Sequence, residues 1–378
     1  MSVRVPFVDL RAQYRAIQAE IHAAIGRVLE EAAFIKGKYV EAFEHAYARA
    51  YGVPHCIGVG NGTDALFIAL RALGIGPGDE VLVPALTWIS TAETVSLTGA
   101  RPVFVDIEPD YYTLDPEHAA ARITERTRAI IPVHLYGQPA AMDAILELAQ
   151  RHGLAVIEDC AQAHFACYRG RLVGTFGSVG TFSFYPAKNL GAYGDAGALI
   201  TADDAIATFA RKFANHGSLT KHEHELEGIN SRLDGLQAAI LQVKLRYIHQ
   251  WTARRAELAR RYAELLADLD ELVLPRIRPH CSHVFHLYVV RTPWRDELQR
   301  FLADRGIQTQ IHYPRALPFV PVYQHFGHRP EDFPVAWRFQ HELLSLPLYP
   351  ELTEEQLQYV CQSIRDFFAH QCRQFLRP

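Results

Sequence analysis

The chain has 378 residues, of which 49% are hydrophobic and 21% are charged, as in soluble globular proteins. Its 38 basic and 42 acidic residues give a net charge of −4, which gives no reason to expect nucleic acid or an anionic membrane as the main partner. The sequence has no apolar run of membrane-spanning length and no signal-peptide core near its start, so we expect a cytoplasmic protein.

Between residues 51 and 203, short apolar segments alternate with segments of helical period. The expected strands, rich in Val and Ile, cover residues 55–59, 80–86, 101–107, 128–136, 154–160 and 178–185. Each intervening helical segment ends on a glycine, which favours a left-handed C-terminal cap. These segments cover residues 63–74, 88–99 and 140–153. The alternation predicts an α/β fold with a mostly parallel central sheet flanked by helices.

The pattern changes near Leu236. Residues 236–269 predict one long amphipathic helix, and a strand and two further helices follow it. The last helix begins at Thr353, with Gln356 at capping-box spacing. We therefore predict a large domain with an N-terminal arm over residues 1–245 and a smaller C-terminal α+β domain over residues 246–378. A ligand site is expected at the carboxyl ends of the large-domain strands, near the domain junction.

A glycine-rich turn, "GVGNGTDAL", follows the first strand from Gly58 to Leu66. Such a turn presents backbone N–H groups to an anion, and the next helix, with Thr63 as its expected cap, adds its dipole. Thr63 stands where a GxGxxG motif needs its third glycine, so a dinucleotide-dependent oxidoreductase is not favoured. Asp64 would oppose an anion unless its side chain points away.

Two other strands end in groups that suit a ligand. Trp88 follows residues 80–86, where a flat ring can stack on a planar ligand. Glu158 and Asp159 end another strand, and alternation sends them to opposite faces. Buried there, Asp159 requires a cationic partner. A helix cap or a metal ligand is the alternative, but no His or Cys cluster at ligand spacing accompanies it, so no metal site is predicted.

Lys188 follows a buried strand that carries Ser183, in "FSFYPAKNLGAYGDAGAL". One strand separates Lys188 from Asp159, so both can reach the same sheet edge. An amine, a carboxylate, an aromatic ring and an anion-binding turn describe a site for a planar, phosphorylated, cationic aromatic that reacts with an amine. Pyridoxal 5′-phosphate (PLP) fits each part, because lysine condenses with its aldehyde and a carboxylate keeps its ring nitrogen protonated.

These motifs resemble the DegT/DnrJ/EryC1/StrS family of sugar aminotransferases, which are fold-type I PLP enzymes. The resemblance covers nearly the whole chain. It rests on the segments "VPFVDL", "FIKGKYVEAFEHAYARAYG", "NGTDAL", "PALTWISTAE", "VHLYGQ", "EDCAQAH", "FSFYPAKNLGAYGDAGA", "NSRLDGLQAAIL", "IHYPRALPF" and "LSLPLYPELTEEQ".

The resemblance implies cofactor roles for several residues. Lys188 would be the imine-forming catalytic base and Asp159 the partner of the pyridine nitrogen. Gln162 would contact the ring hydroxyl, and Trp88 would stack on the ring. The expected phosphate ligands are Gly62, Thr63 and Ser183.

The resemblance also implies a homodimer with shared active sites. Asn230 would reach the phosphate of the neighbouring subunit's cofactor. The substrate candidates are Arg232, Lys36, His312 and Tyr313, and Arg315 joins Arg232 and Lys36 as a candidate for contacting a diphosphate.

The implied reaction has two halves. L-Glutamate converts the cofactor to pyridoxamine 5′-phosphate and leaves as 2-oxoglutarate, and the amine then passes to a nucleotide-linked keto sugar while Lys188 moves the proton. "NSRLDGLQAAIL" and "IHYP" favour a 3-keto sugar, carried by UDP or dTDP. The product would be an amino sugar for lipopolysaccharide, O-antigen or other surface polysaccharide, or for glycoside biosynthesis.

Three alternatives remain open at this point. One is a 4-keto sugar aminotransferase of the same family. A PLP- or pyridoxamine-dependent sugar dehydratase is less favoured, because those relatives carry histidine in place of the lysine that Lys188 matches. A non-catalytic sensor is disfavoured by the intact set of Asp159, Gln162, Ser183 and Lys188.

Overall fold

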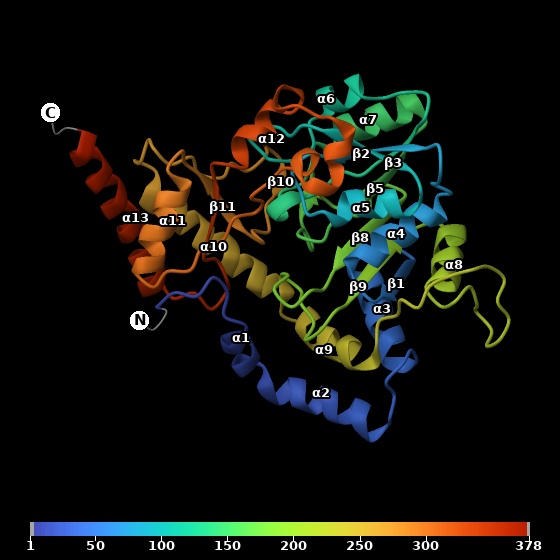
Figure 1. Ribbon diagram of the computed structural model, residues 1–378. Coiled ribbons are helices and arrows are strands. Elements are labelled where there is room, and N and C mark those ends of the chain that lie inside the picture. The colour runs from blue at the N-terminus through green and yellow to red at the C-terminus, as the bar shows by residue number, and fades with distance from the viewer. Residues whose placement is uncertain (1–3, 376–378) are drawn as a thin grey trace.

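The computed structural model describes residues 4–375, with side chains up to residue 369. Figure 1 shows a large body built around a central sheet and, beside it, a smaller C-terminal body. Among the described residues, every helix is too short or too polar to cross a lipid bilayer.

The central sheet confirms the predicted α/β class. Within residues 4–375 its strand order is β1-β9-β8-β5-β4-β2-β3. The strands are β1 (His55–Val59), β2 (Glu80–Pro84), β3 (Arg101–Val105), β4 (Thr127–Ile130), β5 (Ala155–Asp159), β8 (Val179–Ser183) and β9 (Gly197–Thr201). Strand β9 runs against both β1 and β8, while β8, β5, β4, β2 and β3 run parallel. The carboxyl ends of the parallel strands therefore share one edge.

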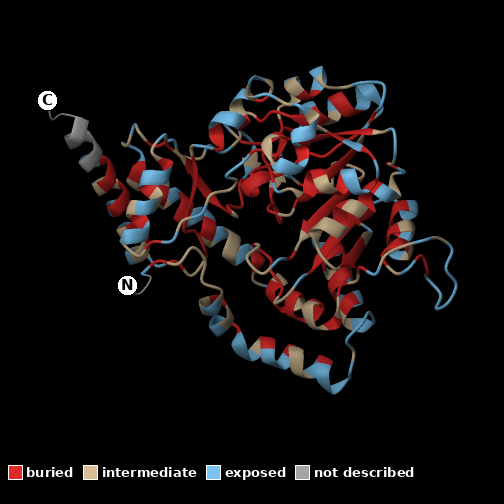
Figure 2. Ribbon diagram, in the orientation of Figure 1, coloured by how far each residue is buried: buried red, intermediate tan, exposed pale blue. Residues whose placement is uncertain are grey.

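Helices cover both faces of this sheet, because its strands are buried on both sides. In β2, Val81 and Val83 face one core while Leu82 faces the other. The first core includes α4 (Gly62–Ala72), α5 (Ser90–Leu97) and α8 (Asp204–Phe213). The second includes α3 (Lys38–Tyr51), α6 (Pro116–Ala121), α7 (Met142–His152) and α9 (Gly235–Leu245). Figure 2 shows the buried residues concentrated along these contacts.

The predicted glycine caps are confirmed. Gly74, Gly99 and Gly153 follow α4, α5 and α7 with φ angles of 73°, 86° and 67°. Side chains rarely adopt this left-handed region, so glycine ends each helix at little conformational cost.

The C-terminal body has its own small antiparallel sheet, β11 (Tyr288–Arg291) paired with β12 (Leu343–Leu346). Its core joins Leu258, Tyr262, Leu298 and Leu344. The helices around it are α10 (Ile248–Leu266), α11 (Arg295–Asp304) and α13 (Glu354–Phe375), whereas α12 (Pro334–Phe339) packs in the first core of the large body. The predicted capping box is present at α13.

Short elements join these parts. The small strands are β6 (Cys167–Tyr168), β7 (Arg171–Leu172) and β10 (Cys281–Ser282), and β10 pairs the second body onto the first. The 3₁₀ turns are η1 (Leu135–Gly137), η2 (Leu317–Phe319), η3 (Pro321–Phe326) and η4 (Pro330–Asp332).

The single helix predicted over residues 236–269 is wrong. Helix α9 ends at Leu245 and α10 begins at Ile248. The break is closed by tight bonds from the N–H groups of Arg246 and Tyr247 to carbonyls three residues earlier. It arises because α9 packs in the large body, whereas Leu258 and later α10 residues pack in the C-terminal core.

The chain start touches both bodies. Val5 forms a parallel bridge with Ile307 of the C-terminal body. Helix α1 (Leu10–Ala16) follows, and α2 (Gln18–Glu30) then packs on α9 (Figure 1). We propose that the domain boundary lies between residues 245 and 246, with the first residues of the arm spanning the junction.

Glu158 ties a loop to the sheet. Its fully buried carboxylate accepts a hydrogen bond from His134 Nε2 at 3.0 Å. It also accepts the backbone N–H groups of Gly174, Phe176 and Gly177 at 2.7, 2.6 and 2.8 Å. These contacts hold the loop that leads into β8.

We expect Glu158→Gln to lower the free energy of unfolding by about 3 kcal/mol, because an amide NH₂ would face backbone donors in a site that needs an acceptor. Urea denaturation followed by circular dichroism measures this. Glu147→Gln removes an exposed carboxylate paired with Arg151 and should cost at most about 0.5 kcal/mol. Equal losses in the two variants would contradict the assignment.

Candidate active site

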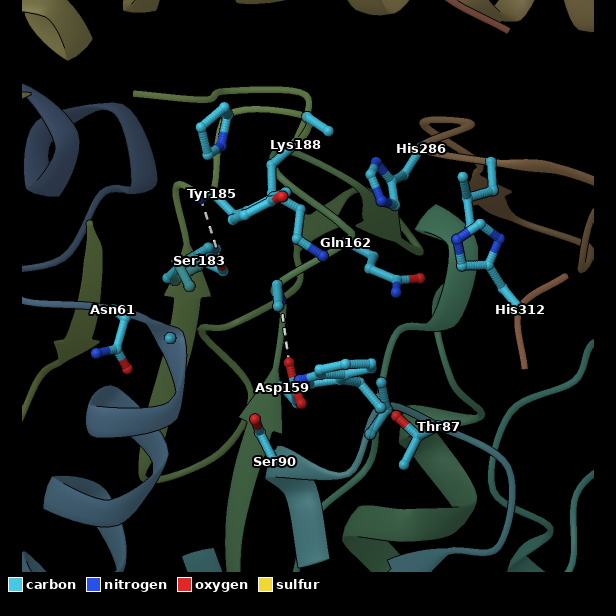
Figure 3. Close-up of a pocket in the computed structure, with 18 of the residues that line it drawn as sticks. Asn61, Thr87, Ser90, Asp159, Gln162, Ser183, Tyr185, Lys188, His286 and His312 are labelled. Atoms are coloured by element: carbon cyan, nitrogen blue, oxygen red, sulfur yellow. Dashed lines mark hydrogen bonds between the residues drawn. The ribbon is translucent and has the colours of Figure 1, made fainter. Parts of the chain in front are cut away.

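A cavity of about 670 Å³ lies at the carboxyl ends of β5 and β8. Three distant parts of the chain line it. The arm contributes residues 7–10 except Asp9, the large body contributes the ends of its strands and the start of α4, and the C-terminal body contributes residues near 286, 312 and 346. Figure 3 shows polar side chains of the large body and of the C-terminal body around one space.

Lys188 reaches this cavity from the loop after β8. Its N–H bonds to the carbonyl of Tyr185 at 2.8 Å, which closes a turn. The loop then folds back so closely that a Cβ on Gly191 would lie 2.2 Å from the Pro186 oxygen, so glycine is required there. Burial lowers the pKa of Lys188 to about 8, although the nearby Asp159 carboxylate acts in the opposite direction.

The lowered pKa can be tested in the cofactor-free protein. We expect the acylation rate of Lys188, followed by peptide mass spectrometry, to titrate with a midpoint near 8. A free lysine side chain in a short unstructured peptide titrates at about 10.4 and serves as the reference. A midpoint for Lys188 equal to that of the reference peptide would show that burial does not perturb its amine.

Asp159 and Glu158 point to opposite faces of β5, as predicted. Asp159 Oδ2 accepts the Thr91 hydroxyl at 3.1 Å, and Oδ1 accepts the Ala161 N–H at 3.1 Å. The carboxylate is only 6% exposed, and this burial raises its pKa. A protonated ring nitrogen would satisfy such a group.

The anion-binding turn forms at the start of α4, but the predicted cap is wrong. Asn61, not Thr63, caps the helix, because its Oδ1 accepts the Asp64 N–H at 2.8 Å. The Thr63 hydroxyl instead contacts the Ser90 hydroxyl at 2.7 Å, at the cavity wall. Asn61 and Thr63 are both residue types that cap helices, and only the backbone geometry separates them.

The same turn lies against the end of β8. A Cβ on Gly62 would lie 2.8 Å from the Ser183 Cβ, so only glycine allows this approach. Asp64 Oδ2 is bound by the Ser231 hydroxyl at 2.6 Å and by Asn61 Nδ2 at 3.0 Å. The Asp64 side chain does not line the cavity, so its charge is directed away from the anion position.

Gln162 and two aromatic rings form the opposite wall. Gln162 Oε1 accepts the Tyr136 N–H at 2.7 Å, which fixes the amide, and its Nε2 donates to the Tyr313 hydroxyl at 2.9 Å. The Trp88 ring lies 5.9 Å from the Tyr313 ring and is 58% exposed, so a face is left for a planar ligand. His312 Nδ1 contacts the Ser345 hydroxyl at 2.8 Å.

Four predicted residues do not line this cavity. Asn230 is exposed, and its backbone forms an isolated antiparallel β-bridge with Asn215. Arg232 donates a hydrogen bond to Asn215 Oδ1 at 3.4 Å. The pKa of Lys36 is lowered first by partial burial of its amine and then by the positive charge of Arg232. These side chains therefore gather at a second place on the chain. Arg315 is exposed and also lies outside the cavity lining.

Three other residues that line the cavity or contact Asp159 were not predicted as site residues. Thr91 lies in the quoted segment "PALTWISTAE", but helical spacing gave no reason to choose it. His286 lies just before β11, and it lines the cavity. Arg255 is 4% exposed, and its Nη1 donates to the Leu348 carbonyl at 2.8 Å. Its neighbours in the long helix include several other arginines, so the sequence does not single it out.

One buried cluster has metal-ligand spacing within the described residues. It contains His134, Glu158 and Cys160. His134 Nδ1 already accepts the Ala140 N–H at 3.0 Å, and its Nε2 donates to Glu158. The imidazole of His134 and the carboxylate of Glu158 are thus used within the protein, which favours a structural role for the cluster.

The donor set of the cavity fits PLP. The glycine contact at Gly62 and the Ser183 hydroxyl suit a phosphate, Asp159 suits a ring cation, and Lys188 supplies an amine of lowered pKa. The model for the DegT/DnrJ/EryC1/StrS aminotransferase family matches residues 15–365. The chain belongs to this family. Family membership confirms the predicted enzyme class and, with it, the PLP cofactor.

Relatives of this aminotransferase are similar along nearly their full length. It is 48% identical to a dTDP-3-amino-3,4,6-trideoxy-alpha-D-glucose transaminase from Streptomyces venezuelae, over 96% of each chain. It is 46% identical to a UDP-N-acetyl-3-dehydro-alpha-D-glucosamine 3-aminotransferase from Acidithiobacillus ferrooxidans, over 96% of this chain and 97% of the relative.

The fold agrees with a solved structure. The crystal structure of S. venezuelae DesV in complex with a ketimine intermediate matches with a TM-score of 0.95 and 47% identity, covering 97% of this chain and 99% of the other. The predicted fold class is thereby confirmed for this aminotransferase.

Proposed function

We propose that this aminotransferase moves the amino group of L-glutamate to the 3-keto carbon of a UDP- or dTDP-linked sugar. The product is a nucleotide-linked 3-amino sugar. The observation that carries the proposal is the meeting of Lys188, Asp159 and the α4 turn in one cavity of a family member. The relatives from S. venezuelae and A. ferrooxidans support carbon 3, because both are named for chemistry at that position.

The cofactor site assigns one task to each residue. When bound, PLP supplies an aldehyde that accepts amines and a ring that withdraws electrons. Asp159 would hold a proton at the ring nitrogen, and Thr91 orients its carboxylate. Gly62, Thr63 and Ser183 would hold the phosphate at the start of α4, where the helix dipole favours an anion. Trp88 would cover one ring face, and Gln162 would contact the ring hydroxyl.

Lys188 moves the proton that transamination requires. Its lowered pKa leaves a useful fraction of neutral amine near pH 8, which can take a proton from a substrate carbon and later return it. Tyr136 and Gln162 position Tyr313, and Ser345 positions His312, so both reach the side of the cavity where a sugar would lie.

The residues outside the cavity support a shared site. Asn230, Arg232 and Lys36 lie together away from this chain's own cavity, which suits contact with the cofactor and diphosphate of a neighbouring subunit. We therefore propose a homodimer in the cytoplasm that serves surface polysaccharide or glycoside biosynthesis.

A substrate panel tests the function. The purified holoenzyme is incubated with L-glutamate and with UDP- and dTDP-linked 3-keto and 4-keto sugars, and products are identified by mass and NMR. Amination at carbon 3 with formation of 2-oxoglutarate is the expected result. Amination only at carbon 4 would favour the alternative substrate, and no amination of any sugar would overturn the proposal.

Mixed dimers test the shared site. We expect Lys188→Ala and the double variant Asn230→Ala/Arg232→Ala to be nearly inactive as separate homodimers. A mixed dimer isolated with two different tags should recover about half the wild-type rate, because one of its two sites is intact. Activity of the mixed dimer no higher than the average of its parents would place all residues of a site on one chain.

A further inference from the structure

His286 lies in the cavity beside Lys188. It precedes β11, is half-buried and lines the cavity. Figure 3 shows its ring projecting into the space between Lys188 and His312. None of the cofactor contacts described above uses it.

The tautomer of His286 follows from the residue next to Lys188. Asn189 Nδ2 donates to the Val284 carbonyl at 3.0 Å, which fixes the orientation of the buried amide. Asn189 Oδ1 then faces His286 Nδ1 at 3.3 Å. A carbonyl oxygen can only accept, so Nδ1 carries the proton and Nε2 carries a lone pair.

The lone pair faces the cavity. Within the described residues His286 Nε2 has no hydrogen-bond partner, and it is not among the buried polar atoms without one. It is therefore accessible to a ligand in the cavity that the side chain lines.

The surroundings keep this ring neutral. Burial, followed by the charges of Lys188 and Arg255 and by His312 and His164, holds the pKa of His286 well below its usual range. The ring can accept a proton only briefly, which suits a group that passes a proton on.

We propose that His286 is a second proton-transfer residue of the site, which receives a proton from the amine nitrogen of the incoming donor. This rests on the proposed function. An amino acid enters as an ammonium ion, which has no lone pair for attack. One N–H bond of the ammonium breaks, an N–H bond forms at His286 Nε2, and the donor nitrogen keeps the electron pair as a free amine. A second donor proton passes to Lys188 Nζ, which is released as a neutral amine. His286 gives the first proton to solvent, so the imidazole ends neutral.

Other bases in the cavity are less suitable. Lys188 would be bonded to the cofactor when the donor arrives. The Asp159 carboxylate accepts hydrogen bonds from the Thr91 hydroxyl and the Ala161 N–H. Asp195 lines the cavity but is exposed. Asp195→Asn therefore serves as a separate arm of the test, and it should not reproduce the effect of changing His286.

The test is the rate of the glutamate half-reaction against pH, measured by stopped-flow absorbance on the holoenzyme. His286→Phe should slow it by about 10²-fold at pH 7, the usual contribution of a general base. The loss should shrink about tenfold for each pH unit up to the pKa of the donor amine, because solvent then supplies the free amine. His286→Gln, which keeps a polar side chain of similar reach, should behave as His286→Phe does.

A matched control and a measurement without cofactor complete the test. His283 is a buried histidine that lies outside this cavity, and its Nδ1 accepts the Phe285 N–H at 2.9 Å. The variant His283→Phe should therefore leave the pH profile unchanged. In the cofactor-free wild type, ¹⁵N NMR should find the proton of His286 on Nδ1.

Each outcome is decisive. A proton on Nε2, or a loss in His286→Phe that does not change with pH, would overturn the assignment. The same pH-dependent loss in Asp195→Asn would assign the role to that carboxylate instead. A wild type that reacts with no amine donor would overturn the proposed function, while the NMR measurement would still decide the tautomer.

Discussion

Lys188→Ala is expected to lower the rate of amino transfer by at least about 10³-fold, since a positioned acid–base group alone contributes 10²–10⁴-fold. The variant should also lose covalent attachment of the cofactor. Borohydride reduction followed by peptide mapping measures attachment, and product mass measures transfer. The visible absorbance of the wild-type holoenzyme should be lost as well.

A second buried lysine provides the control. Lys244 is fully buried, and its Nζ donates to the Gly191 carbonyl at 2.6 Å, close to the same loop. Burial lowers its pKa to about 7, so it is the chemical rival for the cofactor. In Lys244→Met, the cofactor fixed by borohydride should still be attached to Lys188. Fixed cofactor in Lys188→Ala, or fixed cofactor on Lys244 in the wild type, would contradict the assignment.

Asp159→Asn is expected to lower kcat by roughly 10²–10³-fold, the usual loss when a preorganised electrostatic partner is removed. The carboxamide has nearly the same shape, but it carries no charge to hold a proton on the ring nitrogen. Steady-state kinetics at saturating glutamate measures the loss, and absorbance of the bound cofactor shows that the site is still occupied.

Two further variants serve as comparisons for the Asp159→Asn result. Thr91→Val removes the hydroxyl that donates to Asp159 and should cost about tenfold, the size of one hydrogen bond to a charged group. Asp203→Asn changes the N-cap of α8, at the far end of β9, and should leave kcat within about twofold. An Asp159→Asn enzyme as active as Asp203→Asn would show that the ring nitrogen needs no anionic partner.

The buried strands and glycine-capped helices were predictable because their signals are local. Hydrophobic alternation around Leu82 and the position of Gly153 depend on neighbouring residues alone. The cap of α4 and the break after α9 were not predictable in this way. Asn61 and Thr63 are both good caps, and the turn at Arg246 depends on which core each half of the segment joins.

The residues of the candidate site also fall into a predictable group and an unpredictable group. Lys188 and Asp159 follow strands of one sheet, so topology alone brings them to one edge. His286 and Arg255 come from the other body, and no spacing in the sequence relates them to β5 or β8. Their positions in the cavity depend on how the two bodies dock. The local pattern of residues in the sequence does not predict that docking.

The first residues of the chain have a practical importance. Phe7 stacks on His312 with ring centres 5.8 Å apart, and Val8 and Leu10 also line the cavity. A purification tag fused ahead of them would be tethered beside the substrate, and a protease that trims them would open the chamber while the sheet and Lys188 stayed in place. Substrate preference measured on tagged or trimmed protein would then describe an altered enzyme. Placing the tag at the other end avoids this.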